Sequence, residues 1–121
     1  MDIEKLKQAV IDALEDMKGT EITVMDVRKL TSMATYMIIC EATSTRHAKS
    51  LANNVREKLK EAGADFRGTE GEKEGEWVLV DLGDIIVHIM LPATRAYYNL
   101  EQLWGAAEVR RQHVTPDAIN E

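Results

Sequence analysis

Two short apolar runs separated by Gly83 and Asp84 constrain the fold of this chain more than any other feature. Residues 77–82 and 85–91 are rich in β-branched and large apolar side chains, and a Gly-Asp pair between such runs is typical of a tight hairpin turn. A two-residue loop places Leu82 opposite Ile85, so one face of the hairpin is entirely aliphatic and should lie on a core. The other face is mixed and fits a partly covered contact surface, since it carries Trp77, Leu79, Asp81, Ile86, His88 and Met90.

The spacing of apolar residues predicts the elements around this hairpin. Helical periodicity predicts a helix over residues 3–17 that stops at Gly19, and a second helix that starts after Thr43 or Ser44 and ends at Gly63. Strands are predicted at residues 21–27 and 35–41, with a short one near 66–68. After the hairpin, Pro92 should end the last strand, and residues 99–104 should form a short helix. This order predicts an α/β domain over residues 1–105 with a mixed sheet of about five strands flanked by helices. Residues 106–121 are predicted to be a weakly ordered tail.

The composition fits one small domain in a reducing compartment. A chain of 121 residues with 45% hydrophobic content is long enough for one core and too short for two. Its single cysteine, Cys40, cannot form an internal disulfide, and its apolar surroundings favour a buried small hydrophobe over a reactive thiol. Charged residues interrupt the first 17 positions, and no stretch approaches the roughly 20 apolar residues that span a bilayer. The expectation is a cytoplasmic protein without membrane contact.

The charge balance restricts the kind of partner. The chain has 21 acidic and 15 basic residues, for a formal net charge of −6. A protein that coats a phosphate backbone needs concentrated Lys and Arg, so we expect little direct RNA contact and a basic protein as the main partner. The acidic run at residues 70–76 is typical of a solvated loop.

Two catalytic interpretations rest on too few residues. Asp81 and Asp84 are the only carboxylates placed for metal-dependent nucleotidyl transfer, but Asp84 suits the turn and no Gly-Ser loop precedes the second helix. His88 lies diagonally across the hairpin from Asp81, yet no Ser, Thr or Cys between residues 70 and 92 could serve as nucleophile. The three histidines show no metal-ligand spacing. We therefore predict no enzyme activity, no metal and no cofactor.

The hairpin, the segment that follows it and residues 26–48 resemble the ribosomal silencing factors, or Iojap family. The resemblance rests on E-G-x-x-x-G-x-W-V-L-x-D-x-G-D-x-x-V-H and R-x-x-Y-x-L-E-x-L-W, and on D-V-R-K-L-T-S-M-A-T-Y-M-I-I-C-E-A-T-S-T-R-H-A at residues 26–48. It extends to about Gly105. Four positions depart from the residues usual in the family: Thr35, Ala42, His47 and Thr94.

The resemblance implies a nucleotidyltransferase-like topology and a translational repressor. Such a factor binds the large ribosomal subunit through large-subunit ribosomal protein fourteen and sterically blocks joining of the small subunit in starvation or stationary phase. A nucleotide-binding or nucleotidyltransferase-like enzyme and a scaffold that forms a homodimer when free are the alternatives. Tyr97, Tyr98 and Trp104 fit either a core or a contact. Aromatic and flexible apolar side chains dominate binding hot spots, so the predicted contact residues are Trp77, His88, Met90, Leu91, Tyr98, Leu100 and Trp104.

Overall fold

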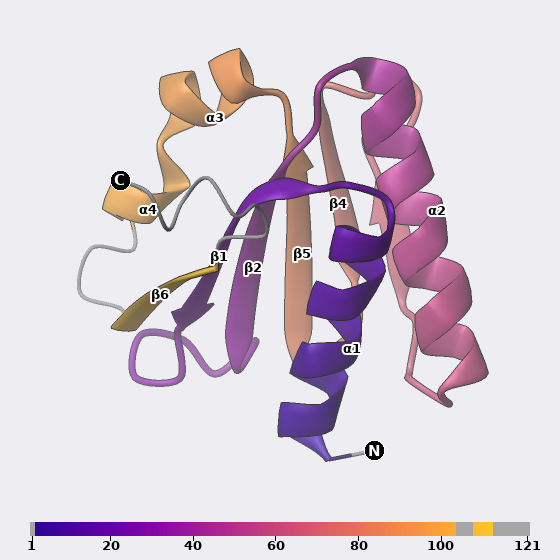
Figure 1. Cartoon of the computed structure of the whole chain (residues 1–121). Coiled ribbons are helices and arrows are strands. Elements are labelled where there is room, and N and C mark those ends of the chain that lie inside the picture. Colours follow the sequence, from indigo (N-terminus) through magenta and orange to yellow (C-terminus); the bar gives the residue numbers. More distant parts are fainter. Residues whose placement is uncertain (1, 104–107, 113–121) are drawn as a thin grey trace, which may run out of the picture.

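The chain folds into one mixed β-sheet with helices on both of its faces (Figure 1). The computed structural model describes residues 2–103 and 108–112, and the side chains of residues 2–102. The predicted single α/β domain with a mixed sheet is confirmed. Five of the six strands, β1 to β5, are those expected from the sequence. The elements, in chain order, are α1 (Ile3–Asp16), β1 (Thr20–Asp26), β2 (Tyr36–Glu41), α2 (Thr45–Glu61), β3 (Gly68–Glu70), β4 (Trp77–Asp81), β5 (Ile85–Met90), α3 (Pro92–Tyr98), α4 (Leu100–Leu103) and β6 (Glu108–Gln112).

The sheet has the strand order β3-β4-β5-β2-β1-β6. All neighbouring strands are antiparallel except the central pair, β2 and β5, which run parallel with Ile38 opposite Val87. A parallel pair cannot be joined by a tight turn, and here α2, β3 and β4 make the connection.

The predicted hairpin is confirmed in position and register. Val80 pairs with Val87 and Val78 with Ile89, and the Leu82 amide donates to the Ile85 carbonyl across the turn at 2.9 Å. Gly83 has φ +82°, a conformation that suits glycine. Asp81 also stabilises the turn, because its Oδ1 accepts a hydrogen bond from the Gly83 amide at 2.8 Å.

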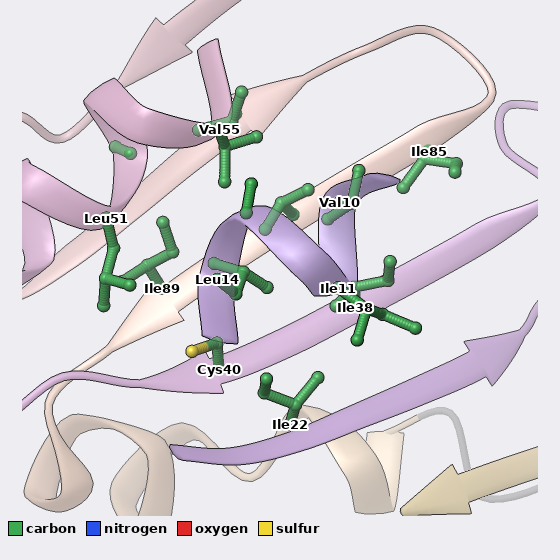
Figure 2. Close-up of a cluster of buried hydrophobic side chains, with 14 of the residues drawn as sticks. Val10, Ile11, Leu14, Ile22, Ile38, Cys40, Leu51, Val55, Ile85 and Ile89 are labelled. Atoms are coloured by element: carbon green, nitrogen blue, oxygen red, sulfur yellow. The ribbon is translucent and has the colours of Figure 1, made fainter. Parts of the chain in front are cut away.

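The aliphatic face of the sheet is covered by α1 and α2 (Figure 2). Helical spacing brings Val10 and Leu14 of α1 and Leu51 and Val55 of α2 onto the same core, where all four are buried. Ser44 is the N-cap of α2, since its hydroxyl accepts from the His47 amide at 3.0 Å. The sequence had left Thr43 and Ser44 open for this role.

The opposite face of the sheet also carries a hydrophobic cluster. Met25, Ile39 and Met90 are fully buried there, and Leu100 of α4 packs with them. The middle strands are thus buried on both faces, which is why β2 reads as a continuous apolar run rather than an alternating one.

Three elements differ from the prediction. The strand expected near residues 66–68 lies at Gly68–Glu70. Pro92 ends β5 as predicted but also begins a helix, because proline is well suited to the first helical position, and α3 was missed. The strand β6 lies within the predicted tail and pairs with β1. Residues 113–121 of that tail are outside the described residues.

Glycines shape the loop that enters β4. Gly71 has φ +83°, and a Cβ atom there would collide with the backbone carbonyl oxygen of Trp77. Gly75 has φ +77° and lies against Thr45 at the start of α2. The E-G-x-x-x-G pattern therefore reflects backbone geometry that positions Trp77.

Gly71→Ala should lower the free energy of unfolding by about 3 kcal/mol or more, because it combines a strained φ with a clash against backbone. Gly63→Ala is the matched control. Gly63 has a similar φ of +86° but open space around it, so only the strain of about 1 kcal/mol applies. Urea unfolding of both variants measures the difference, and equal destabilisation would contradict the clash.

Candidate partner-binding surface

The helix α3 lies at the end of the sheet where the parallel strands β2 and β5 terminate (Figure 1). The chain leaves β5 at Leu91, whose amide donates to the Glu76 carbonyl at 3.1 Å, and Pro92 then starts the helix. Asn99 ends it in a left-handed conformation, with its amide donating to the Arg95 carbonyl at 2.8 Å.

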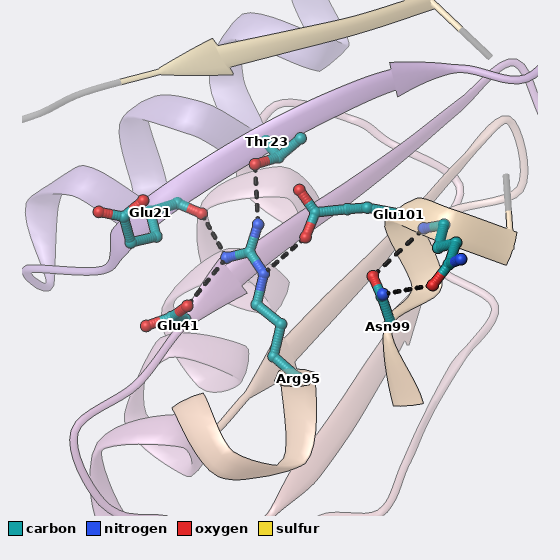
Figure 3. A network of polar contacts seen from close by, with 7 residues as sticks. Glu21, Thr23, Glu41, Arg95, Asn99 and Glu101 are labelled. Carbon is teal, nitrogen blue, oxygen red and sulfur yellow. Dashed lines mark hydrogen bonds and ion pairs between the residues drawn. The ribbon is translucent and has the colours of Figure 1, made fainter. Parts of the chain in front are cut away.

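A buried arginine fixes this helix to the sheet (Figure 3). Arg95 is only 7% exposed, and its guanidinium contacts the neighbouring strands β1 and β2. Nη1 donates to the Glu21 carbonyl at 2.6 Å and to Glu41 Oε2 at 3.3 Å, and Nη2 donates to Thr23 Oγ1 at 2.8 Å. Nε donates to Glu101 Oε1 of α4 at 3.1 Å. Arg95 thus joins β1, β2, α3 and α4, and its charge is matched by carboxylates as a buried charge requires.

The backbone of β1 is adapted to this arginine. The register of β1 against β2 shifts between Thr20 and Thr23, and Glu21 has φ +49°, which is rare for a residue other than glycine. Such an irregularity turns a peptide group out of the ladder, and here the Glu21 carbonyl faces Arg95. Burial raises the pKa of the Glu41 carboxyl above its ordinary value, and the nearby Arg95 guanidinium offsets only part of this rise.

Three aromatic side chains meet on the outer side of α3 and β4, and we call this set the aromatic surface: Trp77, Tyr97 and Tyr98. The ring centroids of Trp77 and Tyr98 are 4.8 Å apart, and those of Tyr97 and Tyr98 are 5.0 Å apart in an edge-on arrangement. Tyr97 is 82% exposed and Tyr98 54% exposed. These tyrosines are therefore surface residues and not part of the core.

The buried His88 side chain contacts Trp77 of the aromatic surface. The indole Nε1 of Trp77 donates to His88 Nδ1 at 2.9 Å, so the imidazole accepts at Nδ1 and carries its proton on Nε2 when neutral. Burial lowers the pKa of His88 to about 4. The buried Nε2 has no hydrogen-bond partner among the described residues. A neutral His88 thus holds the Trp77 ring in place.

The predicted contact residues divide into an outer and an inner group. Trp77 and Leu91 are half-buried and Tyr98 is exposed, whereas His88, Met90 and Leu100 are buried. Trp77 packs against the cluster that holds Met90 and Leu100, while Leu91 packs against the core under α1 and α2. Met90 lies opposite Trp77 in the hairpin, as predicted, but it is fully covered. Only the outer group presents surface to a partner in this conformation. Trp104 lies outside the described residues.

The catalytic alternatives find no support in the positions of their residues. Asp81 accepts from the Gly83 amide, and His88 Nδ1 is occupied by Trp77, so no Asp-His hydrogen bond forms. Asp84 is an exposed turn residue whose carbonyl accepts from the Thr35 and Tyr36 amides. Cys40 is buried in the core, where desolvation raises its pKa to about 12, so the interpretation as a small hydrophobe is confirmed.

Among residues 2–103 and 108–112, no group of three or more His, Cys, Asp or Glu side chains is arranged to hold a metal ion. Within the same ranges, no helix has the length and apolar character to cross a membrane.

Comparison with known proteins identifies the family. A model of the family described as "Ribosomal silencing factor during starvation" matches residues 1–121. The chain belongs to the ribosomal silencing factor family. The Ribosomal silencing factor RsfS of Chromobacterium violaceum is 53% identical over 105 residues, which cover 87% of this chain and 86% of that protein. A crystal structure of a protein from the same organism has a TM-score of 0.85 at 53% identity and covers 87% of this chain and 88% of that one.

A more distant relative in the family comes from an animal. The mouse protein named "Mitochondrial assembly of ribosomal large subunit protein 1" is 31% identical over 98 residues, which cover 78% of this chain and 43% of that protein.

The structure gives physical reasons for the family pattern R-x-x-Y-x-L-E-x-L-W. Arg95 and Glu101 form an ion pair. Leu100 is buried in the hydrophobic cluster that contains Met25, Ile39 and Met90. The Tyr98 ring packs against Trp77 at a tilt of 49°. The pattern therefore marks how α3 and α4 are held together. Sequence reasoning missed Arg95 as a structural centre, although an arginine between two apolar elements was the available signal.

The depressed pKa of His88 predicts a pH-dependent stability. Because the folded-state pKa of about 4 lies below the ordinary value of 6.5, the unfolded chain binds a proton that the folded chain does not, and stability falls as the pH drops from 6.5 toward 4. The loss should total about 3 kcal/mol. His88→Gln removes this titration, so urea unfolding at several pH values should show a smaller loss in the variant. Parallel curves for the two proteins would contradict a neutral, buried His88.

Proposed function

We propose that this protein is a non-enzymatic translational repressor that binds the large ribosomal subunit and blocks its association with the small subunit. Membership of the ribosomal silencing factor family assigns it a ribosome-associated silencing role, and the family description names starvation as the condition. The name of the mouse relative refers to the large subunit. The observation that carries the proposal is the aromatic surface, in which the exposed Tyr97 and Tyr98 adjoin the half-buried Trp77.

The aromatic surface has the properties of a protein-binding hot spot. Tyrosine and tryptophan contribute most to affinity when they are held rigidly and become covered. Here His88 orients Trp77 by a hydrogen bond, and the tilted Tyr98 ring packs against Trp77. Arg95 fixes the helix that carries both tyrosines. Little conformational entropy is then lost on docking, which raises affinity for the same contact area.

The charges around this surface favour a basic partner. Glu74 and Glu76 are exposed next to Trp77 in the chain, and the formal net charge is −6. An acidic rim speeds encounter with a basic surface and disfavours acidic partners. We therefore propose large-subunit ribosomal protein fourteen, the partner implied by the family resemblance, as the protein that covers the aromatic surface.

The proposed mechanism is steric and needs no covalent step. A folded domain bound on the face of the large subunit that meets the small subunit occupies space that the joined ribosome requires. The fraction of silenced subunits then depends only on affinity and concentration. Such a factor acts before joining and has little access afterwards.

Purified protein should lower the yield of joined ribosomes from isolated subunits, but should leave ribosomes that are already joined largely intact. Light scattering after a magnesium jump measures joining. Co-sedimentation with each isolated subunit identifies the target, and we expect binding to the large subunit alone. Normal joining at a saturating concentration of the protein would exclude the silencing mechanism.

Tyr98→Ala should weaken binding to the large subunit by about 2 kcal/mol or more, or roughly 30-fold, because an exposed hot-spot ring is lost. Its melting temperature should change little, since Tyr98 is more than half exposed. The matched control is Lys58→Ala, an exposed residue on α2, which should cost well under ~1 kcal/mol of binding. A Tyr98→Ala protein that melts and binds like the wild type would remove the aromatic surface as the docking site.

A further inference from the structure

The exposed side of α2 differs in charge from the rest of the chain. The chain has six more acidic than basic residues, yet residues 42–56 contain no Asp or Glu and include Arg46, Lys49 and Arg56. Arg56 pairs with Glu72 at 3.4 Å. Arg46 and Lys49 are exposed and have no carboxylate within ion-pair distance in the part of the chain whose side chains are described.

The side chains around these two cations line a shallow groove along the helix. Thr45, Arg46, Lys49, Ser50 and Asn53 line a shallow space of about 350 Å³. Each of the five side chains carries hydrogen-bond donors, and two are positively charged. The Asn53 amide already donates to Glu57 Oε2 at 3.4 Å, so Thr45, Arg46, Lys49 and Ser50 are the main donors to a ligand. Hydroxyl, amide, ammonium and guanidinium groups together match the oxygens of a phosphodiester, since most protein contacts to nucleic-acid backbones are made by these groups.

The helix α2, whose first half lines this groove, begins at the same end of the sheet as α3, which carries Tyr97 and Tyr98 (Figure 1). The parallel strands β2 and β5 end together there, and α2 follows β2 while α3 follows β5. The loop that leads to Trp77 runs past the start of α2, where Gly75 packs against Thr45. The helix α2 and the Trp77 side chain lie on opposite faces of the sheet, since α2 packs on one hydrophobic cluster and Trp77 on the other. A partner as large as a ribosomal subunit can reach both faces at this end of the sheet.

We propose that the groove on α2 binds the sugar-phosphate backbone of RNA beside the protein contact, an inference that rests on the proposed binding to the large subunit. The negative net charge does not oppose this contact. Screening at physiological salt limits each charge to about 8 Å, so two unpaired cations act on a phosphate locally. The contact orients the protein and adds a salt-dependent part to an affinity that the aromatic surface dominates.

The test compares the salt dependence of binding. Affinity for isolated large subunits is measured at roughly 50 and 200 mM KCl for the wild type, for the double variant Arg46→Ala/Lys49→Ala and for Lys58→Ala. With two phosphate contacts, the wild-type affinity should fall about tenfold more over this range than that of the double variant. Lys58→Ala, an exposed lysine on the same helix but outside the groove, should behave as the wild type.

A second measurement identifies the bound molecule. An iron chelate attached through Glu57→Cys, an exposed position next to the groove-lining Asn53, generates hydroxyl radicals, which cut RNA close to the groove. The only native cysteine, Cys40, is buried with a raised pKa and should not be labelled. Cuts in large-subunit RNA are expected from position 57, while the same chelate on Lys5→Cys, an exposed position near the start of α1, should leave those nucleotides intact.

The outcomes separate this inference from the proposed function. A double variant with the salt dependence of the wild type would overturn the phosphate contact while leaving the large subunit as partner. A weaker salt dependence without RNA cuts would mean that an acidic protein segment occupies the groove, and would also overturn it. If the wild type does not bind the large subunit at all, the proposed function fails and this contact fails with it.

Discussion

The parallel pairing of β2 with β5 is the constraint on which the rest of this structure depends. These strands are the third and fourth of the six-stranded sheet, and their residues are buried on both faces. A parallel pair requires a crossover connection, and α2, β3 and β4 supply it. Because the two strands run in the same direction, both terminate at the same end of the sheet, and the chain segments that follow them begin side by side. The aromatic surface and the groove on α2 both lie at that end of the sheet.

A buried arginine supplies hydrogen-bond donors to the polar groups at this end of the sheet. The ends of central strands leave carbonyl groups and carboxylates near the interior, and a polar group without a partner there is costly. Arg95 satisfies the Glu21 carbonyl, Glu41 and Glu101 at once. It therefore does two things, since it neutralises acidic groups and holds α3 in the orientation that exposes Tyr97 and Tyr98.

The hairpin shows how one element can serve both core and surface. Its aliphatic side contributes Val80, Val87 and Ile89 to the core under α1 and α2. Its other side carries His88 and Trp77, which are linked by a hydrogen bond. The core side gives the rigidity, and a rigid base keeps the exposed rings ready for a partner at small entropic cost.

The amino-acid pattern predicted much of the fold, because local rules control it. Alternation and a two-residue turn set the register of β4 and β5, and apolar spacing defined α1 and the buried stripe of α2. By contrast, β6 was missed because its few apolar residues give no strand signal without the β1 edge that it pairs with. The short helix α3 was missed because proline both ends a strand and starts a helix.

The sequence by itself determined the hairpin, the helices α1 and α2, the family and the aromatic character of the candidate surface. Only the tertiary structure decided which of the predicted contact residues face outward, since β-strand alternation gives a side of the sheet and not what covers it. Thus Tyr98 is exposed whereas Met90 and His88, on the same side, are buried. Long-range contacts such as those of Arg95 with β1 join residues more than 70 positions apart, and no local pattern encodes them.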